Sequence, residues 1–295
     1  MTRENNKNDH GYHRPVLVEE TLQALQIQPT GTYVDATFGG GGHSREIIRA
    51  LGPKGRLIGF DQDADAWANA LPDERFCLIP ENFRFLNRFL RVQQALPVDG
   101  ILADLGVSSH QFDTAERGFS IRMDAPLDMR MDRRQSLTAA KVLQTYEEAA
   151  LWQLLEQYGE LRNARSLAVH LVEARKRFPI DTVGALKTVL TPMIRGSERR
   201  YLAQVFQALR IAVNDEMGAL QDFMTQAAEA LKPGGRLVVI TFHSVEDRVV
   251  KQYMKKGKAA EKLNLLYKKP LQPAAEEVRQ NPRAASAKLR AAQRI

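Results

Sequence analysis

The chain has 295 residues, of which 44% are hydrophobic and 26% are charged, a balance typical of one large or two ordinary globular domains. Its apolar runs are much shorter than the roughly 20 residues of a membrane-spanning helix, and the polar stretch from Met1 to Gly11 lacks a signal-peptide core. We therefore expect a cytoplasmic protein without a membrane partner. The single cysteine, Cys77, excludes an internal disulfide and a multi-thiolate zinc site, and we expect no metal.

The charge is positive and unevenly distributed. The chain has 42 Lys and Arg against 35 acidic residues, a net charge of +7, which favours a polyanionic partner. Basic residues are concentrated in 248–269 and in 279–295, and the second range contains no acidic residue. The sequence thus predicts a basic C-terminal tail that contacts a nucleic acid.

Short apolar runs alternate with helix-like stretches in the N-terminal part of the chain, as in a parallel sheet covered by helices. The predicted strands are Thr32 to Ala36, Arg56 to Phe60, Phe76 to Ile79 and Val98 to Ala103. Predicted helices between and after them are Ser44 to Leu51, Ala64 to Ala70 and Arg84 to Leu96. We therefore expect an α/β fold.

The alternation then stops. Residues 112–134 show no clear periodicity, and 137–210 are typical of successive amphipathic helices without strands. Strand character returns at Arg236 to Phe242, after a turn predicted at Lys232 to Gly235. The predicted division is 1–112 and 206–295 for one split α/β domain, with a helical domain inserted at 113–205.

A glycine-rich loop joins the first predicted strand to the next helix. It runs from Asp35 to Ser44 and contains four consecutive glycines, which allow the backbone to approach a ligand at a helix N-terminus. Gly39 and Gly41 match the first two glycines of the dinucleotide fingerprint, but Ser44 stands where the third is expected. A flexible turn without a ligand is the alternative.

Acidic residues end the neighbouring strands. Asp61 follows Gly39 by 22 residues, close to the roughly 20-residue offset of a ribose-binding acid; capping of the next helix is its other possible role. Asp104 ends the fourth strand, and Phe83 follows the third, where its ring could pack on adenine or belong to the core. Asp35, at the end of the first strand, is the third acid of this kind. Acids at the ends of three strands fit a cofactor that has an amino acid end and no pyrophosphate.

Several long blocks, in order along the chain, resemble the MraW-type methyltransferase family. They are His13 to Leu17, Asp35 to Ser44, Asp104 to Ser109, Glu116 to Ser120, Pro126 to Asp132, Phe206 to Ile211, Asn214 to Glu216, Phe242 to Arg248, and Asn281 to Arg283. This resemblance implies a class I (Rossmann-like) methyltransferase sheet with an inserted all-helical domain. It also implies S-adenosylmethionine as cofactor and methylation of the exocyclic N4 of a cytidine in small-subunit (16S-type) ribosomal RNA, near the decoding site.

The resemblance implies cofactor contacts at Gly41, Gly42, His43, Asp61, Phe83, Asp104 and Gln111. For catalysis we expect hydrogen-bond acceptors at the end of the fourth strand, at Asp104, Ser108 and Ser109. For RNA contact we expect Arg117, Arg130, His243 and Arg248, with Arg133 beside them. The arginines could instead form a salt-bridged surface, and His243 could be a structural residue.

Other functions remain open at this point. A methyltransferase of DNA cytosine would share the cofactor chemistry, and a non-catalytic RNA-binding protein would share the fold. A dehydrogenase would require the missing third glycine. The partner is expected to be small-subunit ribosomal RNA or the small ribosomal subunit, with the protein a monomer or a weak homodimer. Ala284 to Ser286 replaces the further arginine common in the family, which weakens the case for RNA contacts by the tail.

Overall fold

A computed structural model describes residues 15–295, so that His13 and Arg14 of the first family block lie outside the described residues. The chain forms two compact units. The first contains residues 15–61, 65–109 and 223–295, and the second contains 62–64 and 110–222. The domain boundaries inferred from the sequence remain a prediction.

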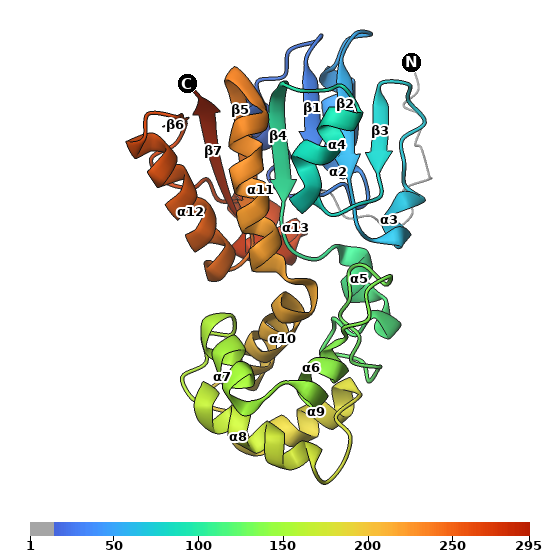
Figure 1. Cartoon of the computed structure of the whole chain (residues 1–295), viewed down its shortest axis with the longest axis vertical. Helices are drawn as coiled ribbons and strands as arrows, with labels where there is room; N and C mark the ends of the chain where they lie inside the picture. Colours follow the sequence, from blue (N-terminus) through green and yellow to red (C-terminus); the bar gives the residue numbers. More distant parts are fainter. Residues whose placement is uncertain (1–14) are drawn as a thin grey trace. The chain divides into compact units, whose positions relative to one another are not determined.

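The first unit is built on one seven-stranded sheet with the order β3-β2-β1-β4-β5-β7-β6 (Figure 1). Its strands are β1 (Thr32–Asp35), β2 (Arg56–Phe60), β3 (Phe76–Ile79), β4 (Val98–Asp104), β5 (Leu231–Thr241), β6 (Leu263–Leu265) and β7 (Lys288–Arg294). β1 to β5 pair in parallel, while β7 runs antiparallel to β5 and β6. The four early strands are confirmed with ends within one residue of prediction.

Helices flank this sheet. In chain order they are α1 (Val18–Leu25), α2 (Gly42–Ala50), α3 (Ala64–Trp67), η1 (Phe83–Phe85), α4 (Leu86–Val92), α11 (Glu216–Ala230), α12 (Ser244–Ala259), α13 (Ala275–Gln280) and η4 (Pro282–Ser286). The first residue of α3 and residues 216–222 of α11 belong to the second unit. One core cluster joins Leu25 of α1 and Ile47 of α2 to the sheet residues Leu57 and Leu102, all at most 2% exposed. The predicted helix to Leu96 ends earlier, because Gln94 has a left-handed φ of 49°.

The second unit is helical. Its elements are α5 (Ser109–Asp113), η2 (Ala115–Arg117), α6 (Ala139–Thr145), α7 (Glu148–Gln157), α8 (Ala164–Arg175), α9 (Val183–Leu190), η3 (Thr191–Met193) and α10 (Glu198–Asn214). Thr138, Thr182 and Ser197 cap three of these helices by accepting a backbone N–H. The expected all-helical insertion is therefore confirmed.

The C-terminal segment corrects the sequence prediction. Residues expected to form a basic tail make β7, which lies between β5 and β6. Arg290 of this strand pairs with Asp247, and the Arg294 guanidinium donates to the carbonyls of Glu229 and Leu231. β5 also begins at Leu231, so the predicted turn at 232–235 is a strand irregularity with Gly234 at φ 81°. Across residues 15–295, no helix has the length and apolar character to cross a membrane.

Candidate active site

The glycine loop joins β1 to α2 with two residues in left-handed backbone geometry. Gly39 has φ 53° and Gly41 has φ 71°, and Gly41 N–H donates to the Phe38 carbonyl at 2.8 Å. A Cβ on Gly41 would lie 2.9 Å from the Phe38 ring, and one on Gly42 would lie 2.9 Å from Pro15. Because these contacts are too short for a side chain, the loop requires glycine at both positions.

Asp61 follows β2 and binds the glycine loop directly. Its Oδ2 accepts the Gly39 N–H at 2.7 Å, and its backbone carbonyl accepts the Trp67 indole N–H at 2.9 Å. Asn69 adds a further bond to the Gly39 carbonyl at 3.2 Å. The Asp61 carboxylate is thus held at the turn of the loop, where the sequence suggested a ribose contact; that contact remains a prediction.

Asp35, at the end of β1, is buried with 1% of its surface exposed. Its Oδ2 accepts the Ser44 hydroxyl at 2.7 Å, and its Oδ1 accepts the Thr37 N–H at 3.1 Å. Burial raises the pKa of the Asp35 carboxyl, although the bond from Ser44 and the charge of His43 oppose the rise. Ser44, which replaces the third fingerprint glycine, therefore anchors the start of α2 to β1.

His43 lies in the first turn of α2 beside Asp104 at the end of β4. The distance from His43 Nε2 to Asp104 Oδ2 is 3.5 Å, an ion-pair distance, and His43 is 7% exposed. Burial lowers the pKa of His43, but the charges of Asp104 and Asp35 outweigh it, and the net pKa is raised. Within residues 15–295, His43 Nε2 and Asp104 Oδ1 are buried without a hydrogen-bond partner.

The end of β4 is fixed by its neighbours. Asp104 N–H donates to the Thr37 hydroxyl at 2.6 Å, and Leu105 N–H donates to the Ile240 carbonyl of β5 at 3.0 Å. Gly106 then turns the chain with φ 102°. Ser108 and Ser109 follow in the same unit. The structure therefore places Asp104 beside the glycine loop, at the carboxyl edge of the sheet where ligands bind in open α/β folds.

Two expected cofactor residues have other contacts. The Phe83 ring packs edge-on against Phe223, with 5.2 Å between ring centroids. Part of the Phe83 ring therefore packs in the core. Gln111 belongs to the second unit, is 5% exposed, and donates to Asp63 at 2.6 Å. Their cofactor contacts remain predictions.

Two of the arginines expected to bind RNA are engaged in structural pairs. Arg117 is 1% exposed, and its guanidinium donates to both oxygens of Asp63 at 2.7 and 3.1 Å and to the Arg130 carbonyl at 2.9 Å. Arg130 itself forms a two-bond pair with Asp128, which lowers the pKa of that carboxyl against the effect of burial. This geometry argues against phosphate contact by Arg117 and supports the salt-bridged alternative.

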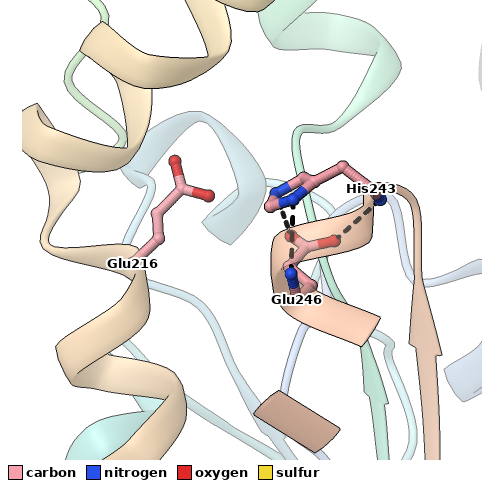
Figure 2. Close-up of side chains that lie close together, drawn as sticks. All are labelled: Glu216, His243 and Glu246. Carbon is pink, nitrogen blue, oxygen red and sulfur yellow. Dashed lines mark hydrogen bonds and ion pairs between the residues drawn. The ribbon is translucent and has the colours of Figure 1, made fainter. Parts of the chain in front are cut away.

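His243 caps α12 together with Glu246 (Figure 2). His243 Nδ1 accepts the Glu246 N–H at 3.3 Å, so the remaining ring proton of neutral His243 lies on Nε2, which is 3.1 Å from Glu246 Oε1. Glu246 Oε2 in turn accepts the backbone N–H of His243 at 3.3 Å and that of Phe242 at 2.9 Å. Both sides of the capping box are thus formed, which favours the structural role of His243. Arg248 lies exposed on the same helix.

Comparison with known proteins identifies the family. Residues 10–295 match the model of the MraW methylase family. The chain belongs to the MraW methylase family. Proteins named "Ribosomal RNA small subunit methyltransferase H" are 53% identical in Flavobacterium johnsoniae, 52% in Bacteroides fragilis and 52% in Cytophaga hutchinsonii. These alignments cover 96% of this chain and 98%, 97% and 99% of the relatives, respectively. The family resemblance is confirmed, and the observed α/β sheet with a separate helical unit agrees with the expected architecture.

Sequence reasoning missed several residues that shape the site of this methylase. Thr37 fixes the Asp104 backbone, and Glu246 fixes His243. Asp63 carried no sequence signal of its own, although it holds Arg117 and Gln111. Thr37 lies inside a quoted block, so its position was available, but its partner is 67 residues away and emerges only from the pairing of β1 with β4.

Proposed function

We propose that this chain transfers the methyl group of S-adenosylmethionine to the exocyclic N4 of a cytidine in small-subunit ribosomal RNA. The observation that carries the proposal is about 50% identity to small-subunit ribosomal RNA methyltransferases over nearly the full length of both chains. The site adds support, because its glycine loop, Asp61 and Asp104 are all present and meet at one edge of the sheet.

The residues at this edge fit S-adenosylmethionine. The left-handed glycines let backbone N–H groups approach a ligand, and the Asp61 carboxylate can accept ribose hydroxyls. His43 Nε2 and Asp104 Oδ1, which lack hydrogen-bond partners within residues 15–295, supply a donor and an acceptor for polar groups of the cofactor. When bound, the cofactor supplies an electrophilic methyl group on a sulfonium.

The remaining task belongs to the protein. The N4 amine of cytosine is a weak nucleophile because its lone pair is delocalised into the ring, so the amine must be held in line and its hydrogen bonds accepted as positive charge develops. The nitrogen gains the methyl carbon as the bond from that carbon to the sulfonium sulfur breaks, the electron pair stays on sulfur, and the nitrogen loses one proton. Asp104, with Ser108 and Ser109 on the segment after β4, provides acceptors for this step. The target base must be unstacked to reach them.

The first experiment is transfer of labelled methyl from S-adenosylmethionine to small ribosomal subunits that lack their modifications, followed by nucleoside analysis. N4-methylcytidine is the expected product. Methylation of cytosine in DNA, with no label in RNA, would show that the proposed RNA substrate is wrong. Cofactor binding without transfer to subunits, free RNA or DNA would instead identify a non-catalytic binder.

Asp104→Asn tests the carboxylate. Amide replacement keeps the shape but removes the charge that stabilises the developing cation, so we expect kcat to fall by about 100-fold or more at saturating cofactor. Ser109→Ala is the milder comparison, because one neutral hydroxyl is lost. An Asp104→Asn enzyme that binds cofactor normally and transfers methyl at the wild-type rate would contradict this role.

The partner of this reaction is ribosomal RNA, and we propose the assembled small subunit in the cytoplasm as its physical form. A structured RNA surface would be held by cationic groups flanking the extruded base. A monomer or weak homodimer is sufficient, since one chain carries the glycine loop, Asp61 and Asp104 together. Sedimentation with and without subunits measures both points.

A further inference from the structure

A basic cavity lies in the C-terminal part of the first unit. Its volume is about 280 Å³, near the lower end of ligand-sized pockets. It is lined by α12, by β6 with the segment that follows it, and by β7, which lie next to one another in Figure 1. None of its lining residues belongs to the glycine loop or to the end of β4. The cavity is therefore distinct from the candidate active site.

Close packing forms the apolar part of this cavity. α12 approaches β6 so closely that a Cβ on Gly257 would lie 2.6 Å from the Leu263 side chain. Met254 and Ala291 line the cavity and are buried, with 2% and 3% of their surfaces exposed, and the half-buried ring of Tyr267 lines it as well. The cavity thus combines buried apolar walls with one aromatic side chain.

The rim of the cavity is cationic. Lys251 and Lys255 lie one turn apart on α12, hence on one face, and Lys268 and Lys269 follow β6. All four are exposed, and within residues 15–295 none of their ammonium groups forms a hydrogen bond or an ion pair. Arg290 also lines the cavity, but Asp247 binds it at 2.7 and 3.1 Å.

Four unpaired ammonium groups around one cavity repel one another, and an anion relieves that repulsion. None of the lining residues in the described part of the chain is acidic. We propose that this cavity binds the sugar–phosphate backbone of the substrate RNA outside the methylated nucleotide, with one base packed on Tyr267. A polyanion suits two lysine pairs on separate segments, and stacking on an aromatic ring is the sequence-tolerant contact of single-stranded RNA. The identity of the RNA rests on the proposed function.

The test compares two double variants on one helix. Lys251→Gln with Lys255→Gln removes two charges from the cavity, while Lys256→Gln with Lys258→Gln removes two charges from exposed positions of α12 that do not line it. Both variants have the same net charge. Binding of a fluorescein-labelled single-stranded RNA is measured by anisotropy from 0.1 to 1 M salt, and methyl transfer to small subunits is measured alongside.

Two lost phosphate contacts should reduce the magnitude of the slope of log K against log salt by about 1.4. The ratio of the variant's Kd to the wild-type Kd should therefore be about 25-fold larger at 0.1 M than at 1 M salt. We expect this for the cavity variant only, with a raised KM for subunits and unchanged kcat and cofactor affinity. Equal weakening by both variants, or by neither, would overturn the proposal.

Tyr267→Leu tests the base contact, with Tyr267→Phe as its control. Loss of the ring should weaken RNA binding by about 5-fold or more at every salt concentration, because stacking is not ionic; binding equal to that of the Phe variant would exclude the base contact. Failure of the proposed function has a different signature. If the wild-type chain methylates no subunit but only the cavity variant loses RNA affinity, the proposed methyl transfer is refuted and the proposed RNA-binding role of the cavity is supported.

Discussion

The glycine loop contains two positions, Gly39 and Gly41, that share a left-handed backbone but differ in the space available for a side chain. Gly39 and Gly41 both have left-handed φ angles, 53° and 71°. A Cβ on Gly39 would meet only the Thr37 carbonyl oxygen, at 4.0 Å, whereas a Cβ on Gly41 would lie 2.9 Å from the Phe38 ring. Gly39→Ala therefore adds backbone strain alone, and Gly41→Ala adds strain and steric overlap.

The expected magnitudes follow from these two effects. Left-handed geometry costs an L-residue about 1–2 kcal/mol, and overpacking costs a further 1–3 kcal/mol or so. We expect Gly39→Ala to lower the free energy of unfolding by about 1–2 kcal/mol and Gly41→Ala by about 2–5 kcal/mol. Phe38→Leu combined with Gly41→Ala should recover part of the difference, because the smaller side chain removes the overlap.

Urea denaturation followed by tryptophan fluorescence measures these free energies, and the choice of tryptophan decides which of the two structural units is observed. The chain has two tryptophans; Trp67 belongs to the first unit and Trp152 to the second. In a Trp152→Phe background, the signal reports the unit that contains the loop. If Gly41→Ala is no more destabilising than Gly39→Ala, or if Phe38→Leu gives no recovery in the double-mutant cycle, the steric argument is wrong.

Three further changes test the charged and buried groups. The pKa of His43 is raised, so its positive charge stabilises the fold fully below an unfolded pKa of about 6.5 and loses that effect as pH rises through the folded pKa. The difference in unfolding free energy between wild type and His43→Gln, from urea titrations at pH 5–9, should therefore shrink with rising pH. A difference that increases with pH would contradict this reasoning. Arg117→Met leaves the Asp63 carboxylate buried without its cation and should cost about 3–5 kcal/mol in urea unfolding, most of which Asp63→Asn should restore. Ser44→Ala removes a buried hydrogen bond to the Asp35 carboxylate and should cost about 1.5–3 kcal/mol, whereas Ser44→Thr, which keeps the hydroxyl, should cost less.

The sequence predicted the parallel strands well because their signal is local. β1, β2 and β4 are apolar runs with mostly buried residues, and each is bounded by turn residues. β7 was missed for a physical reason. In Lys288–Arg294 the buried Leu289 and Ala291 alternate with cations, and a basic half-buried strand resembles a charged tail unless its neighbours are known.

The candidate site was predictable in its backbone but not in its pairings. The glycine spacing and the strand-end acids predicted that these residues meet at one edge of the sheet, and they do, because the carboxyl ends of parallel strands converge there. Arg117 was expected to contact RNA because its loop follows directly from the strand that ends at Asp104. Its partner Asp63 is 54 residues away, and only the tertiary fold reveals that this arginine is buried.

The polar atoms around β1 and β4 fall into two groups with different consequences. Asp35 and the Asp104 backbone are fully bonded to Ser44 and Thr37 and hold the loop in place. His43 Nε2 lies at ion-pair distance from Asp104 Oδ2, but it and Asp104 Oδ1 are buried without a hydrogen-bond partner within residues 15–295, and a missing hydrogen bond of this kind costs the fold about 1–3 kcal/mol. A ligand that bonds to both atoms removes this cost in addition to its own contacts. S-adenosylmethionine at 100 times its Kd for the wild type should stabilise the first unit by about 2.7 kcal/mol. At the same cofactor concentration Asp104→Asn, which alters one of the two atoms, should be stabilised less because it binds the cofactor more weakly.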